Sequence, residues 1–279
     1  MRHFYFLLLF GIFFNSFSQS DSLKKEKKQW YVTWGYTRAS YSKSTLRFKN
    51  ESNKFNEFTQ QNDNYDFVVY DAVAKDRPDF NKIKDVVNIT VPQYVFRIGC
   101  MLNNKWGVEL NYDHTKYVVT DWQTVHVKGR VNNNYFDQDT ILDPSNFLHF
   151  EHTDGANFWM INAVRKWDLL KPRKNFEASF VFKPGAGVVI PRTDVTLFGE
   201  RLNNNWHVAG WIVGVESGLR MGFFRNGFFE FTGKGSYADY TACLVLGKGN
   251  GKARHHFFTG QLTATLGVKF GSATKKSSH

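Results

Sequence analysis

Residues 261–270 near the end of the chain alternate strictly between apolar and polar side chains. The apolar face carries Leu262, Ala264, Leu266, Val268 and Phe270, and the other face carries Gln261, Thr263, Thr265, Gly267 and Lys269. Because successive side chains of a strand point to opposite sides, this strand must lie between two different environments. A strand in a membrane β-barrel meets lipid on one side and a polar lumen on the other, so the pattern predicts such a barrel.

The start of the chain has the pattern of a secretory signal peptide. Arg2 and His3 precede an apolar run over residues 4–14, and the small residues Ser16 and Ser18 follow it. We predict a signal peptide over residues 1–18 and a periplasmic segment over residues 19–28. The apolar run is shorter than the roughly 18 residues that a membrane-spanning helix needs, and no later segment approaches that length. No Cys lies directly after the apolar run, so a lipid anchor is not expected.

Eight candidate spanning strands follow, with connectors that are alternately long and short. They cover residues 30–39, 92–101, 105–116, 157–167, 175–190, 206–221, 227–240 and 256–270. The short connectors, at 102–104, 168–174 and 223–226, are rich in Asn, Pro, Gly or charge, as tight turns require. Outer-membrane barrels have an even number of strands, short periplasmic turns and longer extracellular loops. The predicted fold is therefore all-β, a closed antiparallel transmembrane barrel of about eight strands over residues 29–270, followed by a periplasmic tail over 271–279.

The composition fits this fold. Aromatic residues make up 17% of the chain, yet the mean hydropathy is −0.43. A barrel explains both values, because only every second residue of a strand faces lipid and aromatic girdles line both interfaces. Cys100 and Cys243 fall in strands that are not expected to be neighbours, so no disulfide is predicted. No zinc-type Cys spacing is present, and neither a metal nor a cofactor is predicted.

Charged residues share the polar face of several predicted strands. On the lipid face near the midplane, an Arg or Lys would cost about 2–4 kcal/mol, so these side chains are expected to point inward. We predict that they pair and fill the narrow lumen of an eight-stranded barrel. A role in catalysis or permeation is the alternative. The predicted network is Arg97, Glu109, Glu216, Arg220, Glu230 and Lys234.

The formal net charge is +11, and many of the basic residues fall at predicted periplasmic positions, where they would meet anionic lipid headgroups. They are Lys24, Lys25, Lys27, Lys28, Lys171, Arg173, Lys174, Lys275 and Lys276. The charge is not gathered on one helix or stripe and no recognition motif accompanies it. A nucleic-acid partner is therefore not predicted.

The long loops are where a function would lie. Within residues 40–90, the stretches 46–49 and 65–70 alternate and are expected to extend the barrel wall as a hairpin. Residues 117–156 hold the one titratable cluster of interest. Together with His114 across the presumed hairpin, this cluster would supply an acid, a base and a metal or phosphate contact at the outer rim. Ordinary polar rim residues are the alternative. The candidates are His114, Glu151, His152 and Asp154.

Residues 29–270 resemble the small, eight-stranded outer-membrane β-barrel family of Gram-negative bacteria, on the signal peptide, the alternating connectors and the terminal strand ending at Phe270. The resemblance implies a porin-like protein of the cell outer membrane, in contact with outer-membrane lipid and lipopolysaccharide. It also implies that Phe270 is read as an assembly signal by the barrel-assembly machinery, although residues 271–279 follow it. The family includes adhesins, anchors, conduits and enzymes, so membership selects no activity.

Three functions remain open from the sequence. The favoured one is a non-enzymatic barrel protein whose extracellular loops bind a ligand or shield the surface. The second is a lipid-modifying enzyme of the outer leaflet, because His152-Thr153-Asp154 loosely resembles the His and acidic residue of lipid A deacylases; Thr153 stands where those enzymes have Ser. The third is a narrow channel for small solutes.

Overall fold

The computed structural model describes residues 28–56, 61–78, 91–152, 154–173, 176–246 and 251–271. The predicted signal peptide, most of the predicted periplasmic segment and the tail after residue 271 lie outside these ranges, as does Thr153. Every regular element in the described ranges is a β-strand. Nowhere in these ranges does a helix of the length and apolarity needed to cross a membrane occur.

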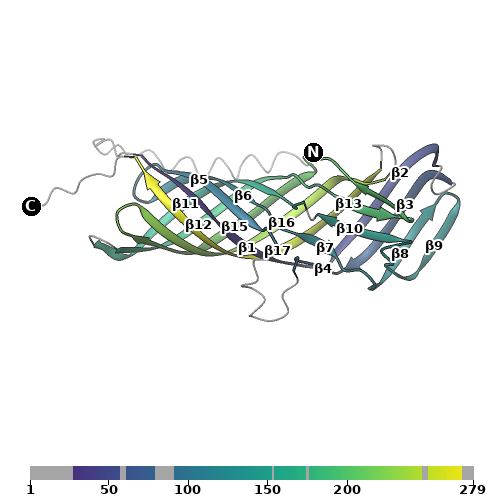
Figure 1. The fold of residues 1–279 in the computed structure, drawn as a ribbon, viewed down its shortest axis with the longest axis horizontal. Coiled ribbons are helices and arrows are strands. Elements are labelled where there is room, and N and C mark those ends of the chain that lie inside the picture. Colours follow the sequence, from purple (N-terminus) through teal and green to yellow (C-terminus); the bar gives the residue numbers. More distant parts are fainter. Residues whose placement is uncertain are drawn as a thin grey trace, which may run out of the picture.

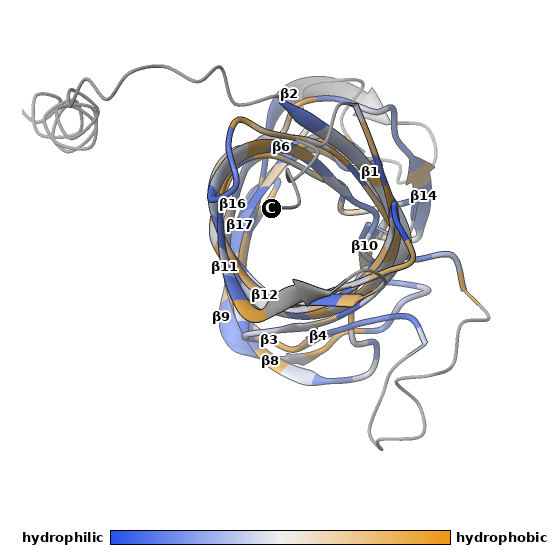
Figure 2. Ribbon diagram, turned by 90° about the vertical axis from the view of Figure 1, so that its left-hand side faces the viewer, coloured by the Kyte–Doolittle hydropathy of each residue, from blue (hydrophilic) through white to orange (hydrophobic). Residues whose placement is uncertain are grey.

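Eight long strands follow one another around a ring, which Figure 2 shows end-on. Each strand pairs antiparallel with both neighbours, and β1 pairs with β5 on one side and with β17 on the other, so the ring of pairings closes. The ring strands are β1 (Gln29–Tyr41), β5 (Tyr94–Met101), β6 (Trp106–Asp113), β11 (Phe158–Arg173), β12 (Phe176–Val189), β15 (Gly210–Phe223), β16 (Gly227–Leu244) and β17 (Lys252–Phe270).

These eight strands correspond to the eight predicted from the sequence, with bounds that shift by a few residues. The predicted short connector at 168–174 is wrong, because β11 continues to Arg173, which pairs with Phe176 of β12. Two register shifts, after Asp168 and after Leu170, allow the pairing to continue past these residues. Extra residues in a strand are accommodated as bulges, so a charged and Pro-containing stretch can remain part of a strand and need not form a turn.

The predicted alternation is present on the ring. On β17, Leu266 is 62% exposed on the outside, whereas its neighbour Thr265 is 2% exposed on the inside. Exposed aromatic side chains lie near both ends of the ring, at one end Trp30, Trp106, Trp167, Phe223 and Phe270, and at the other Tyr94, Trp159, Trp211 and Phe258. The outer wall between them carries exposed aliphatic side chains, including Ile98, Leu110, Ile161, Val213, Leu219 and Leu262.

One end of the ring continues into further strands, which we call the extension (Figure 1). β2 (Ser44–Asn56) pairs with the start of β17 and with β3 (Gln61–Ala72), and the sheet goes on through β8 (Thr124–Val131) to β9 (Asn134–Ile141). The predicted hairpin of 46–49 with 65–70 is thereby confirmed. A second, five-stranded sheet has the order β14 (Glu200–Asn203), β13 (Asp194–Leu197), β10 (Leu148–His152), β7 (Tyr117–Val119) and β4 (Ala74–Lys75).

The two sheets of the extension share an apolar core. The rings of Phe48 on β2 and Phe67 on β3 stack with centroids 5.1 Å apart, and Phe150 on β10 meets Phe48 edge-on at 5.6 Å. All three side chains are fully buried. Buried aromatic pairs of this kind add to the free energy gained from the buried area itself. The core therefore holds the five-stranded sheet firmly against the wall that continues the ring.

Candidate functional site

The six charged side chains predicted to line the lumen lie inside the ring and are almost completely buried. They come from β5, β6, β15 and β16, and the parity of each strand puts them on the inner face. Two further charged residues, Asp113 on β6 and Lys183 on β12, join them. The eight side chains, which we call the lumen network, are Arg97, Glu109, Asp113, Lys183, Glu216, Arg220, Glu230 and Lys234.

Each carboxylate of the lumen network contacts more than one cation. The guanidinium of Arg97 donates to Glu216 at 2.9 Å and lies 3.5 Å from Glu109. Lys183 bridges Glu109, at 3.1 Å, and Glu230. The remaining ion pairs join Arg220 to Glu230 at 2.6 Å, Lys234 to Asp113, and Lys234 to Glu216 at 3.7 Å. Two longer pairs join Arg97 to Asp113 at 3.7 Å and Lys183 to Glu216 at 3.6 Å.

The lumen network is balanced in charge. Arg97, Lys183, Arg220 and Lys234 face Glu109, Asp113, Glu216 and Glu230, which makes four cations against four anions. A buried charge is tolerated when it is paired and its hydrogen bonds are satisfied. Neutral side chains from the other ring strands add contacts, since Asn162 on β11 donates to Glu109 at 3.3 Å and Gln261 on β17 to Asp113 at 3.4 Å.

Tyr31 on β1 contacts two members of the lumen network, Glu109 and Arg220. Its hydroxyl donates to Glu109 at 2.7 Å, and the guanidinium of Arg220 lies 4.5 Å from the centre of its ring. The side chain of Tyr31 reaches Glu109 by lying across Gly99 on the intervening strand β5. A Cβ atom at Gly99 would come 2.1 Å from the aromatic ring of Tyr31. Gly99 is therefore required for this contact, because any larger residue would displace Tyr31.

The structure does not bring the four predicted rim residues together. Glu151 and His152 are adjacent on β10, and successive side chains of a strand point to opposite faces. Glu151 contacts Arg77 at 3.3 Å and His149 at 3.3 Å. His152 instead faces His255, with their Nε2 atoms 3.2 Å apart.

The other two rim residues have further partners of their own. His114 contacts the Asn157 side chain through Nδ1 at 2.8 Å and the Lys116 amine through Nε2 at 3.0 Å. Asp154 accepts a hydrogen bond from Arg192 at 2.8 Å. None of these contacts joins one predicted rim residue directly to another.

The predicted location of His152 at an exposed rim is wrong. Its side chain is 0% exposed and packs between the rings of Phe150 and Tyr240, with centroids 5.0 Å away in both cases. Burial lowers the pKa of His152 to about 3, so the imidazole is neutral at physiological pH. An outer-leaflet lipid cannot reach a side chain enclosed in this way, which argues against the deacylase-like alternative.

His149, which the sequence analysis did not select, lies on the same face of β10 as Glu151. Its Nδ1 is 2.8 Å from Asp121 and its Nε2 is 3.3 Å from Glu151. Hydrogen bonds to Glu151 and to Asp121 raise the pKa of His149 to about 9. The imidazole is therefore protonated at physiological pH and joins two carboxylates beside the central strand of the five-stranded sheet.

We expect His149→Gln to destabilise the protein by about 1–3 kcal/mol at pH 6, as is typical of hydrogen bonds to charged groups. The pKa of His149 in the folded protein lies above the unfolded value of about 6.5. Its contribution is therefore fully present below about pH 6.5 and is lost as the pH rises through about 9. Urea unfolding of parent and variant from about pH 6 to pH 10 measures this, and a difference that stays constant with pH would contradict it.

The remaining predicted residues are placed as follows. Cys100 and Cys243 are free and buried. Phe270 is the exposed last residue of β17 and pairs with Trp30 of β1. Phe223, predicted to lie in a turn, is the last residue of β15. The role of Phe270 in assembly stays a prediction.

Of the comparisons with known proteins, only the search of solved structures finds similar proteins. A scan against protein-family models finds no match, and no curated protein matches the chain. Among solved structures it is similar to Neisserial surface protein A, at 12% identity and a TM-score of 0.32, covering 86% of this chain and 97% of that one. It is also similar to the outer membrane protein OprG from Pseudomonas aeruginosa, at 11% identity and a TM-score of 0.33, covering 89% and 98%.

A third similar structure is Ail, the attachment invasion locus protein of Yersinia pestis, at 12% identity and a TM-score of 0.31, covering 88% of this chain and 99% of that one. These structures are small outer-membrane β-barrel proteins of Gram-negative bacteria. At this level of similarity they say nothing about a ligand. The closed ring of strand pairings is observed in this chain itself and does not depend on these similarities.

Proposed function

We propose that this chain is an outer-membrane β-barrel protein with a sealed lumen, whose extension stands outside the cell and binds a ligand or shields the surface. The observation that carries the proposal is the contrast between the two faces of the ring. Outside, an apolar band of mostly aliphatic side chains, with a few aromatic ones such as Trp34 and Phe231, lies between two sets of exposed aromatic residues. This is the surface that lipid and its two interfaces require. Inside, four cations and four anions are paired out of contact with solvent.

The direction of the barrel follows from its connectors. The turns at 102–105 and 224–226 are short and lie at the end of the ring where β1 begins and β17 finishes. The opposite end carries the extension. Since outer-membrane barrels have short periplasmic turns and longer extracellular segments, the extension is assigned to the outside. Outer-membrane lipid, lipopolysaccharide and the barrel-assembly machinery are then its expected partners.

The lumen network favours a sealed barrel over a solute channel. An eight-stranded barrel has an interior just wide enough to be filled by side chains. Here that interior holds large paired side chains such as Arg97, which is fully buried. We expect the purified full-length protein, inserted in planar lipid bilayers, to produce no conductance steps under conditions in which a 16-stranded porin does. Reproducible steps from the inserted protein would contradict the sealed lumen and favour the channel alternative.

A further inference from the structure

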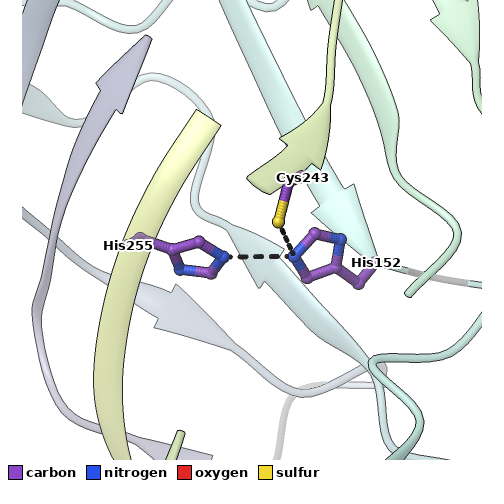
Figure 3. A group of neighbouring side chains, drawn as sticks. All are labelled: His152, Cys243 and His255. Atoms are coloured by element: carbon purple, nitrogen blue, oxygen red, sulfur yellow. Dashed lines mark hydrogen bonds between the residues drawn. The ribbon is translucent and has the colours of Figure 1, made fainter. Parts of the chain in front are cut away.

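Three potential metal ligands from three strands meet in the interior of the extension (Figure 3). They are His152 on β10, Cys243 near the end of β16 and His255 near the start of β17. The Nε2 atoms of the two histidines are 3.2 Å apart, and the Sγ atom of Cys243 lies 3.8 Å from Nε2 of His152. Across the part of the chain that the structure describes, this is the one group of three His, Cys, Asp or Glu side chains that gathers its ligand atoms, here within 4.8 Å of one another.

A backbone irregularity aims Cys243 at the histidines. β16 pairs with β17 in regular register up to Tyr240, opposite His255, and the register then shifts before Cys243, opposite Ala253. In an unbroken strand, residues 240 and 243 would point to opposite faces. The bulge puts both side chains on the buried inner face. Bulges often serve to re-aim a side chain in this way.

The distances fit one metal ion. An ion held at about 2.0–2.1 Å from each nitrogen and about 2.3 Å from sulfur, in a trigonal plane, separates the two nitrogens by about 3.5 Å and nitrogen from sulfur by about 3.8 Å. The two histidine nitrogens are 3.2 Å apart, and the nitrogen-to-sulfur distance at His152 is 3.8 Å. The ligand atoms of Cys243 and His255 lie within 4.8 Å of each other, against about 3.8 Å in the ideal site, so side-chain movements of up to about 1 Å would complete it.

A hydroxyl group lies near the Nδ1 atom of each histidine, on the side away from the other two ligands. The Oγ1 atom of Thr193 is 3.2 Å from Nδ1 of His152, and the Oγ atom of Ser44 is 3.5 Å from Nδ1 of His255. When each Nδ1–H donates to its hydroxyl, both Nε2 lone pairs point toward the space between the rings. Partners of this kind fix the tautomer and orientation of metal-binding histidines in known sites.

We propose that His152, Cys243 and His255 bind a single copper(I) ion. All three side chains are buried, and the rings of Tyr117 and Tyr240 contact both imidazoles, which leaves no solvent-facing side from which a water ligand would come. Copper(I) accepts soft sulfur and imidazole ligands, whereas structural zinc takes four ligands. On binding, the Cys243 thiol loses one proton and the thiolate cancels the single charge of the ion, so the buried site stays neutral and no redox change is needed.

The test uses the full-length protein refolded into detergent micelles under anaerobic conditions, with copper(I) supplied through a competing chelator. We expect about one copper per chain by elemental mass spectrometry, with sulfur and nitrogen ligands in the X-ray absorption spectrum. Cys243→Ser is expected to lower the copper affinity at least tenfold, as loss of the soft ligand predicts. Cys100→Ser, which removes the other buried cysteine, is the matched control and should bind as the parent does.

Thr193→Val provides a second variant that keeps all three ligands. Loss of an outer hydrogen-bond partner is expected to weaken binding about 10–100-fold. Heat-modifiable migration on gels shows that each variant has folded, and Thr193→Val answers the question if Cys243→Ser does not fold. Equal copper in parent and both variants, or a spectrum without a sulfur ligand, would overturn the site. Zinc in place of copper, with the same dependence on Cys243, would overturn the choice of ion.

Discussion

Arg220→Ala is expected to lower the free energy of unfolding by about 3–5 kcal/mol, the cost typical of removing one partner from a buried ion pair. Arg220 is paired with Glu230 at 2.6 Å and covers the ring of Tyr31. Its removal leaves Glu230 with Lys183 as the one cation of the lumen network in contact. Urea unfolding in lipid vesicles measures the difference between parent and variant.

The matched control is Arg47→Ala on β2, in the extension. Arg47 also forms a two-point pair with a carboxylate, Asp66, but its side chain is 53% exposed. Exposed pairs of this kind contribute about 0–1 kcal/mol, so the control should change stability little. If Arg220→Ala unfolds at the same urea concentration as Arg47→Ala, the ring is not held by a buried lumen network.

His152→Ala is expected to destabilise the protein by about 2–4 kcal/mol, well above the roughly 0.5 kcal/mol of a surface substitution. The imidazole fills space between Phe150 and Tyr240, so Ala leaves a cavity there. In the metal-free protein one of the two facing Nε2 atoms carries the hydrogen of their contact, so the substitution also removes the hydrogen-bond partner of His255 Nε2. An unpaired polar atom in a buried site adds to the cost of the cavity.

Thermal and urea unfolding of metal-free protein measure this effect separately from any bound ion. The control is His126→Ala on β8, whose exposed imidazole contacts Asp137 at 2.8 Å and Asp139 at 3.0 Å. We expect the control to change stability by no more than about 1 kcal/mol. A loss of 0.5 kcal/mol or less, about that of a surface site, in His152→Ala would contradict its buried location.

The ring could be predicted because its strands obey a local rule. Period-two alternation determines which face each residue takes, and it correctly puts residues such as Glu216 and Thr265 inside. The same rule applied to β12 would have placed Lys183 inward with Val181, but this lysine precedes Pro184 and Gly185, which obscured the strand pattern. Where a bulge interrupts the alternation, as before Cys243, the sequence alone does not determine which face of the strand a side chain takes.

The candidate site could not be predicted because its parts are distant in the chain. His152 and Cys243 are 91 positions apart, and no spacing rule joins them. The segment around His152 was selected from the sequence as a rim cluster, with Glu151 and Asp154 as its companions from proximity along the chain. The packing of the five-stranded sheet against the sheet that contains the ring decides the true neighbours, and those contacts are tertiary.

Cysteine labelling on intact cells tests the central claim, that this chain spans the outer membrane with its extension outside. Asn133 lies in the β8–β9 turn of the extension, and Asn104 in the short turn between β5 and β6. The native cysteines are buried, which keeps the background low. We predict that a membrane-impermeant maleimide labels Asn133→Cys in unbroken cells and Asn104→Cys only after the outer membrane is opened. Labelling of Asn104→Cys in unbroken cells, or of neither position, would contradict the account.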